Sequence, residues 1–281
     1  MFTAAAPFCF LFDNGSLRAE PTLSLRKVAQ AFARELGKPV QAVSLLHSSG
    51  VPVEALGGEP ARLLEPALVD YFKSHPTGDV VLVPLFFGPS AALTEYVPER
   101  VKAIQVKFPQ AVIRLAPPLM NVADHDDCRV AVMLADQVRA VARTRDWNRP
   151  KVVLVDHGSP QRAVTAVRDH LARQLRAALR EEAEGVVAAS MERREGDAYA
   201  FNEPLLATAL RTPPFNEGEV IVALQFLSPG RHAGPEGDVA KICASARNEY
   251  TRLSTATTEP IATDPRLASL LAERMLQAVT L

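Results

Sequence analysis

The chain has 281 residues, of which 48% are hydrophobic and 22% charged, and its formal net charge is -1. This length suits two ordinary domains or one large one, and the composition predicts a soluble protein with a substantial core. A nearly neutral chain has no general attraction for nucleic acid or for an anionic membrane, so we expect neither as a partner. No apolar run approaches the roughly 18 residues that a membrane span needs.

The three cysteines, Cys9, Cys128 and Cys243, are an odd and scattered set. They argue against a disulfide scaffold and against a cysteine-based zinc site, and they fit a reducing, cytoplasmic location. The apolar beginning, MFTAAAPFCFLF, could be mistaken for a signal peptide, but no basic segment precedes it. We expect it to form the first buried strand.

Two stretches of the chain end in nearly the same way. FCFLFDNGS begins at Phe8 and VVLVDHGS begins at Val152, so that Asn14 and His157 are equivalent at an offset of 143 residues. Near that offset, DVVLVPLFFGPS in the first half also faces EVIVALQFLSPG in the second. The sequence therefore predicts a duplicated half.

The elements expected in chain order alternate between strand and helix. In the first half, strands are predicted near residues 7–12, 40–46, 80–86 and 111–115, each followed by a helix. In the second half, strands are predicted near 152–155, 186–191, 220–224 and 252–257, with helices from Ser159 as N-cap and Pro160 as first residue, at 203–210, at 236–248 and from 265. Such alternation is typical of parallel sheets with right-handed crossovers.

We therefore predict an α/β protein made of two flavodoxin-like halves, each a parallel sheet flanked by helices, with a cleft between them. The halves are expected at residues 1–146 and 147–281, joined near the polar, proline-containing segment TRDWNRP at 144–150.

Three polar residues of the second half follow predicted strands. His157 follows the first, Glu192 the second, and His232 lies in the FLSPGRH loop after the third. Ligands bind at the carboxyl ends of the strands in open parallel sheets, so these side chains are expected to share one edge.

The first half lacks this set. It has Asn14 at the position of His157, Leu46 (with His47 one place off) at that of Glu192, and Ala92 or Leu93 at that of His232. A residue kept only for folding should not depend on which copy it occupies. We infer that the second half carries the chemistry and the first gives shape.

Two neutral imidazoles and a carboxylate can bind a borderline divalent metal ion such as Fe²⁺, Co²⁺, Ni²⁺ or Zn²⁺. Imidazole can also accept protons at neutral pH. Gly158 has no side chain, so a flat ligand could approach the backbone there, and the helix N-terminus that follows favours an anionic group.

The segments VVLVDHGSP, VVAASME and VIVALQFLSPGRH, with VVLVPLFFGPS and RLAPPLM in the first half, resemble the sirohydrochlorin chelatase (CbiX-type) family, in a fused double-length form. The resemblance implies insertion of Co²⁺ or Fe²⁺, with Ni²⁺ a further option, into an anionic tetrapyrrole without ATP or a permanently bound cofactor. It implies that His157 and His232 hold the metal and take the pyrrole protons, and that Glu192 binds metal or relays protons.

Gly158, Ser159 and Arg231 are the expected substrate contacts, and Arg162, Arg193 and Arg194 are candidates by position for the substrate carboxylates. The simplest alternatives make Ser159 only a cap and Glu192 only a solvated residue of the ERREGD run. His125 in DHDD is interpreted as part of a helix start, and His170 as structural or solvated.

One departure from the family pattern is Asp156, which replaces the first glycine of G-H-G-S. It leaves open a non-catalytic metal or tetrapyrrole carrier, and an unrelated α/β binding module is a third hypothesis. A fused double half could replace a dimer of single halves, so we expect a monomer.

Overall fold

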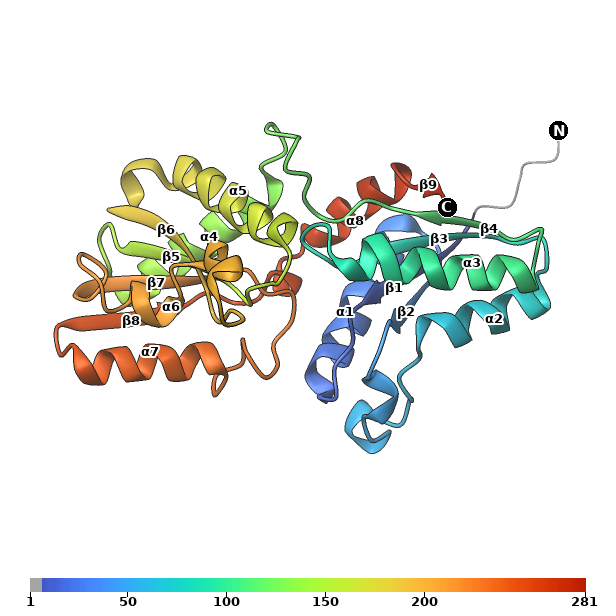
Figure 1. Ribbon diagram of the computed structural model, residues 1–281, viewed down its shortest axis with the longest axis horizontal. Helices are drawn as coiled ribbons and strands as arrows, with labels where there is room; N and C mark the ends of the chain where they lie inside the picture. Colours follow the sequence, from blue (N-terminus) through green and yellow to red (C-terminus); the bar gives the residue numbers. More distant parts are fainter. Residues whose placement is uncertain (1–6) are drawn as a thin grey trace. The chain divides into compact units, whose positions relative to one another are not determined.

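The computed structural model describes residues 7–281; residues 1–6, the start of the apolar N-terminal segment, lie outside the described part (Figure 1). The chain divides into two compact units. Unit 1 comprises Met1–Leu119 and Pro265–Leu281, and unit 2 comprises Met120–Asp264.

Unit 1 is built on a five-stranded sheet with the order β2-β1-β3-β4-β9. The strands are β1 (Phe8–Asp13), β2 (Val40–Ser44), β3 (Asp79–Pro84), β4 (Val112–Leu115) and β9 (Val279–Thr280). β1 to β4 pair in parallel, and only the two-residue β9, which the sequence pattern did not predict, is antiparallel to its neighbour.

Both faces of this sheet are covered, as its continuous apolar runs predict. Phe10 and Phe12 of β1 pack with α2 (Leu64–Ser74) and α3 (Val97–Lys107). Cys9 and Leu11 alternate with them and are equally buried, toward the opposite face. There α1 (Ala19–Leu36) packs against α8 (Leu267–Leu276), near the C-terminus (Figure 1).

Unit 2 repeats the plan with a four-stranded parallel sheet in the order β6-β5-β7-β8. Its strands are β5 (Lys151–Asp156), β6 (Gly185–Ser190), β7 (Gly218–Leu224) and β8 (Leu253–Thr257). α4 (Arg129–Arg145) packs against α5 (Arg162–Leu179), and α7 (Asp238–Glu249) lies on the opposite side of the sheet from α5 (Figure 1). The predicted fold class, two α/β halves with largely parallel sheets flanked by helices, is confirmed.

The units do not follow the expected boundary at residues 146 and 147. α4 follows β4 of unit 1 along the chain but packs in unit 2, and α8 follows β8 of unit 2 but packs in unit 1. Each repeat thus gives its last helix to the other unit. The apolar stripe of α4, which includes Val130, Leu134 and Val138, predicts burial of one face but does not specify which sheet buries it.

The predicted start of α5 is wrong. The helix begins at Arg162 with Gln161 as N-cap and no side-chain cap, and the Ser159 hydroxyl instead accepts a hydrogen bond from the Gln161 backbone N–H at 3.1 Å. The helix predicted at 203–210 is also shorter, with α6 limited to Leu206–Ala209. In the described part of the chain, no helix combines the length and the apolar character that a bilayer crossing requires.

His170 of α5 is buried, 3% exposed, and neither of its ring nitrogens has a hydrogen-bond partner among the described residues. Burial, with smaller contributions from Arg173 and His125, lowers the pKa of His170, while Asp124 opposes this effect. Burial therefore favours the neutral form of this imidazole in the native state. Unfolding at a pH below the ordinary value of about 6.5 takes up a proton, so the free energy of unfolding falls as the pH falls through that range.

We expect the His170→Leu variant to lose less stability between pH 7.5 and pH 5.5 than the natural protein, because the variant has no imidazole to protonate on unfolding. Urea unfolding at the two pH values, followed by circular dichroism, measures the difference. The control is His47→Ala, which changes an exposed histidine. An identical pH dependence in the natural protein and His170→Leu would contradict the assignment.

Candidate functional site

Three loops at the carboxyl ends of β5, β6 and β7 bring together His157, Glu192 and His232. The His157 Nε2 atom lies 3.4 Å from Glu192 Oε1, and the two imidazole rings are 4.7 Å apart between centroids, inclined at 70°. The side chains of His157 and His232 are 49% and 28% exposed, so a ligand can reach both. The convergence at one sheet edge follows the expectation for parallel strands.

The turn that presents His157 depends on glycine at the next position. Gly158 has a φ of 90°, and a Cβ atom built there would lie 1.9 Å from the Glu192 carbonyl oxygen. The Glu192 N–H donates to the His157 carbonyl at 3.2 Å. Only glycine meets both the left-handed backbone and this close approach, so Gly158 sets the separation of the two loops.

Asp156, the residue that departs from the family motif, stabilises the same turn through hydrogen bonds. It is buried, and its Oδ1 accepts hydrogen bonds from the Gly158 N–H at 3.1 Å and from the Ser190 hydroxyl at 2.6 Å. Burial raises the pKa of Asp156, although the Ser190 bond, the nearby Arg168 and the Gly158 bond act in the opposite direction. Asp156 therefore supports the loop and does not pair with the His157 ring.

Asn202 fastens the loop after Glu192 to the loop after His157. It is fully buried, its Oδ1 accepts from the Ser159 N–H at 3.0 Å, and its Nδ2 donates to the Ser159 carbonyl at 2.9 Å. Arg168 donates to the Asn202 carbonyl at 2.9 Å. The sequence pattern does not predict a role for Asn202, because a single asparagine in a loop carries no recognisable signal.

His232 is oriented by a carboxylate. Its Nδ1 lies 2.8 Å from Asp238 Oδ2, and because an ionised carboxylate only accepts, Nδ1 carries the hydrogen and the neutral ring offers its Nε2 lone pair to a ligand. The hydrogen bond from His232 is the largest of the effects that lower the pKa of Asp238, and Arg231 and Lys241 add to it. Asp238 begins α7 and was missed as a site residue, since the length of the loop before it hid the pairing.

We expect Asp238→Asn to weaken metal binding or activity by about 10–100-fold, the usual cost of losing a partner that orients a histidine. An amide at this place can donate as well as accept and no longer fixes one tautomer. Titration with Co²⁺, followed by its visible absorption, measures the affinity. Lys241→Gln is the control, because Lys241 Nζ is 3.9 Å from the same carboxylate and does not touch the ring. Equal Co²⁺ affinity in Asp238→Asn and the natural protein would contradict this role.

His157 has a similar arrangement. Its Nδ1 lies 3.1 Å from the Gly158 carbonyl, which can only accept, so its Nε2 lone pair faces the Glu192 carboxylate. Two acceptors so close together favour a cation between them, either a proton or a metal ion. Among the residues that the structure describes, no three His, Cys, Asp or Glu side chains are placed to hold a metal ion together.

With metal–nitrogen bonds of about 2.0–2.1 Å, two imidazoles on one ion have ring centroids roughly 4–6 Å apart. The separation of 4.7 Å between His157 and His232 falls in this range. The pair can therefore offer two nitrogen ligands and leave the other positions of the ion to a ligand from solution.

Unit 1 has the same backbone turn as the one that presents His157, but without an imidazole or a carboxylate at the equivalent positions. The Leu46 N–H donates to the Asn14 carbonyl at 3.1 Å, as Glu192 does to His157. Gly15 has a φ of 87°, and a Cβ there would lie 1.8 Å from the Leu46 carbonyl oxygen. Asn14 and Leu46 thus occupy the places of the imidazole and the carboxylate.

The structure also decides between the two possible counterparts of His232. The Gly234 N–H donates to the Gly230 carbonyl, and the Thr94 N–H donates in the same way to the Ser90 carbonyl. Gly230 is therefore equivalent to Ser90, and His232 to Ala92.

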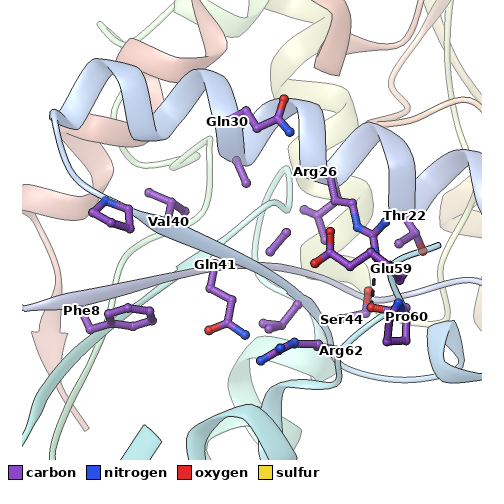
Figure 2. A pocket seen from close by; sticks show the side chains of 16 residues that line it. Phe8, Thr22, Arg26, Gln30, Val40, Gln41, Ser44, Glu59, Pro60 and Arg62 are labelled. Carbon is purple, nitrogen blue, oxygen red and sulfur yellow. Dashed lines mark hydrogen bonds between the residues drawn. The ribbon is translucent and has the colours of Figure 1, made fainter. Parts of the chain in front are cut away.

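A pocket in unit 1 contains none of the predicted site residues. It measures about 410 Å³ and lies between α1 and the edge strand β2 (Figure 2). Its Arg26 already donates to the carbonyl oxygens of Leu56, Glu59 and Pro60. These hydrogen bonds indicate that Arg26 stabilises the loop before α2 and does not take part in catalysis.

Comparison with known proteins agrees with this architecture. The CbiX family model matches residues 151–278. SirB from Bacillus subtilis with Fe³⁺ is 14% identical, with 97% of this chain and 95% of that chain covered and a TM-score of 0.66. SirB from Bacillus subtilis subspecies spizizenii in complex with cobalt is 15% identical over the same shares, with a TM-score of 0.64.

CbiX, described as the terminal enzyme for biosynthesis of sirohaem in denitrifying bacteria, is 18% identical, with 97% of this chain and 99% of that chain covered and a TM-score of 0.60. At such identities the likeness establishes the fold. No curated protein matches the sequence.

Proposed function

We propose, from the match of residues 151–278 to the CbiX family model, that the protein inserts Co²⁺ or Fe²⁺ into sirohydrochlorin or a related anionic tetrapyrrole, without ATP. The observation that carries the proposal is the pairing of the His157 and His232 rings, 4.7 Å apart, at the carboxyl edge of the second sheet. The SirB structures that share this fold contain Fe³⁺ or cobalt, which supports these two metals ahead of Ni²⁺.

The reaction replaces two pyrrole protons of the macrocycle by one divalent ion and releases both protons. A pyrrole N–H is a very poor acid, so each proton leaves only as the metal takes its place. In this scheme the free Nε2 atoms of His157 and His232 hold the incoming ion, and the pyrrole nitrogens complete its coordination. Imidazoles released by the ion, together with Glu192, 3.4 Å from His157, then accept the protons.

In this scheme the surrounding residues position the substrate and the two loops that carry His157 and Glu192. The Glu192 carbonyl takes the space that a side chain would need at Gly158, so Gly158 supports the site by setting the separation of the two loops and not by admitting a flat ring. Arg231, whose side chain is 73% exposed and lies 3.6 Å from Asp238, is a candidate contact for a substrate carboxylate. The Ser159 hydroxyl already accepts a hydrogen bond from the Gln161 N–H within the turn. The position of Ser159 close to the start of α5 is therefore the one observation that supports a substrate contact at this residue.

We also propose that the enzyme acts as a monomer in the cytoplasm. Support for the location comes from Cys9, Cys128 and Cys243, which are all free thiols in the structure.

The test is an assay with purified protein, sirohydrochlorin and Co²⁺ or Fe²⁺ under anaerobic conditions, followed by the absorbance change of the macrocycle. Many turnovers per protein, faster than the reaction without protein, are expected of a chelatase. One equivalent of bound tetrapyrrole or metal, with no acceleration, would replace the proposal with a carrier function. Binding of neither would leave only an unrelated α/β binding module.

A further inference from the structure

We propose that two arginines that lie over aromatic rings, in the segments that follow His157 and Glu192, form a carboxylate-binding subsite for the tetrapyrrole, and this inference rests on the function proposed above. The set consists of Arg162 on Phe201 and Arg194 on Tyr199, and we call it the Arg–aromatic platform. It assigns specificity for an anionic macrocycle to the start of α5 and the segment after Glu192 in unit 2.

The geometry of the platform suits recognition of carboxylates. Arg162 Cζ lies 4.6 Å from the centroid of the Phe201 ring, and Arg194 Cζ lies 5.9 Å from that of Tyr199. The two rings are themselves 6.4 Å apart. A guanidinium that lies over an aromatic ring is attracted by the π face of that ring, and this contact uses none of its N–H groups, so they can bind a carboxylate.

The neighbouring arginines are already occupied, so they are weaker candidates. Arg193 binds Glu203 at 2.6 Å and donates to the carbonyl oxygens of Arg194 and Gly196. In the part of the chain that the structure describes, neither Arg162 nor Arg194 forms an ion pair with a carboxylate of the protein. A substrate carboxylate would therefore not have to displace an internal partner.

The platform is fixed to the candidate site by short connections. Arg194 is two residues beyond Glu192, and Arg162 begins the helix that follows the His157 turn. Phe201 precedes Asn202, the fully buried residue whose amide makes two hydrogen bonds to the backbone of Ser159. The two arginines and His157 thus belong to two segments that the Asn202 side chain joins through its hydrogen bonds to Ser159.

The first half of the chain again lacks the feature. At the offset of 143, Ala19 replaces Arg162, and residues 47–62, which follow the counterpart of Glu192, contain no Tyr or Phe. The aromatic rings and their arginines therefore occur only in the repeat that has the histidines. This is the distribution expected of a substrate subsite and not of a requirement of the fold.

The experiment measures binding of metal-free sirohydrochlorin, and separately the kinetics of Co²⁺ insertion, in Arg162→Ala, Arg194→Ala and the double variant. Each single change is expected to weaken tetrapyrrole binding and raise KM by about ten-fold, with kcat nearly unchanged, because a charge-assisted hydrogen bond is lost but the imidazoles remain. The matched control is Arg145→Ala, since Arg145 lies 6.0 Å from the Trp147 ring at the far end of α4. Binding of an esterified, uncharged tetrapyrrole should be the same in all variants.

The outcomes separate the two proposals. If the natural protein turns over and the double variant keeps its KM, the subsite is wrong and the proposed function stands. If the natural protein binds the tetrapyrrole through these arginines but shows no turnover, the subsite stands and the chelatase function fails. Equal losses for the charged and the esterified macrocycle would overturn the subsite, because they would show that shape and not charge is recognised.

Discussion

Replacing His157 with alanine is expected to lower the rate of metal insertion by about 10²–10⁴-fold, the range usual for loss of a catalytic base. In the proposed scheme the ring supplies one of two nitrogen ligands for the incoming ion, and its Nε2 lies 3.4 Å from Glu192 Oε1. His232→Ala should have an effect of the same order. The rate is measured at saturating sirohydrochlorin from the absorbance of the metallated product.

The control for both variants is His47→Ala. His47 directly follows Leu46, the counterpart of Glu192, so it lies beside the corresponding turn of unit 1 but outside the proposed chemistry. It should keep full activity. If His157→Ala kept full activity as well, the reacting centre would have to lie elsewhere in the chain.

The metal-binding and proton-accepting roles of the site can be separated by varying the concentration of the metal ion. If His157→Ala regains most of its rate at high Co²⁺ concentration, the imidazole acts mainly as a ligand. If kcat stays low at every concentration, the ring is needed after the ion is bound, when protons leave the macrocycle. Glu192→Gln, which keeps the shape and removes the charge, should then lower kcat in the same way.

The strands and the meeting of the two imidazoles were predictable because they depend on local information. A buried strand has a recognisable run of apolar residues, and all strands of a parallel sheet end at one edge, so His157 and His232 had to be neighbours once both were placed after strands. The duplication strengthened the prediction, because it separated residues of the scaffold, such as Gly15 and Gly158, from residues of one copy only.

The features that were missed depend on distances that the sequence does not contain. Asp238 reaches the His232 ring across a loop of five residues whose path no local pattern fixes. The exchange of α4 and α8 between the units was hidden because their apolar stripes fit either sheet. Ser159 and Pro160 have the residue types of a helix start, but the Asn202 side chain hydrogen-bonds to the Ser159 backbone, and the helix begins only at Arg162.

Gly158→Ala is expected to destabilise unit 2 and to abolish most of the activity. A left-handed backbone at a non-glycine residue costs about 1–3 kcal/mol, and here the new Cβ would also lie 1.9 Å from the Glu192 carbonyl oxygen. The two loops must separate to admit it, which moves Glu192 away from His157. Urea unfolding gives the loss of stability, and the insertion rate per folded protein gives the loss of function.

The repeat supplies a matched control in Gly15→Ala. Its Cβ would lie 1.8 Å from the Leu46 carbonyl oxygen in the same left-handed turn, so the loss of stability in unit 1 should be similar. Neither His157 nor Glu192 belongs to that turn, so the folded fraction of this variant should insert metal at nearly the natural rate. Equal losses of activity per folded protein in both variants would contradict a specific role of the His157 and Glu192 loops, because the turn of unit 1 would then affect metal insertion as much. A loss confined to Gly158→Ala would show that the spacing of the His157 and Glu192 loops is itself part of the catalytic design.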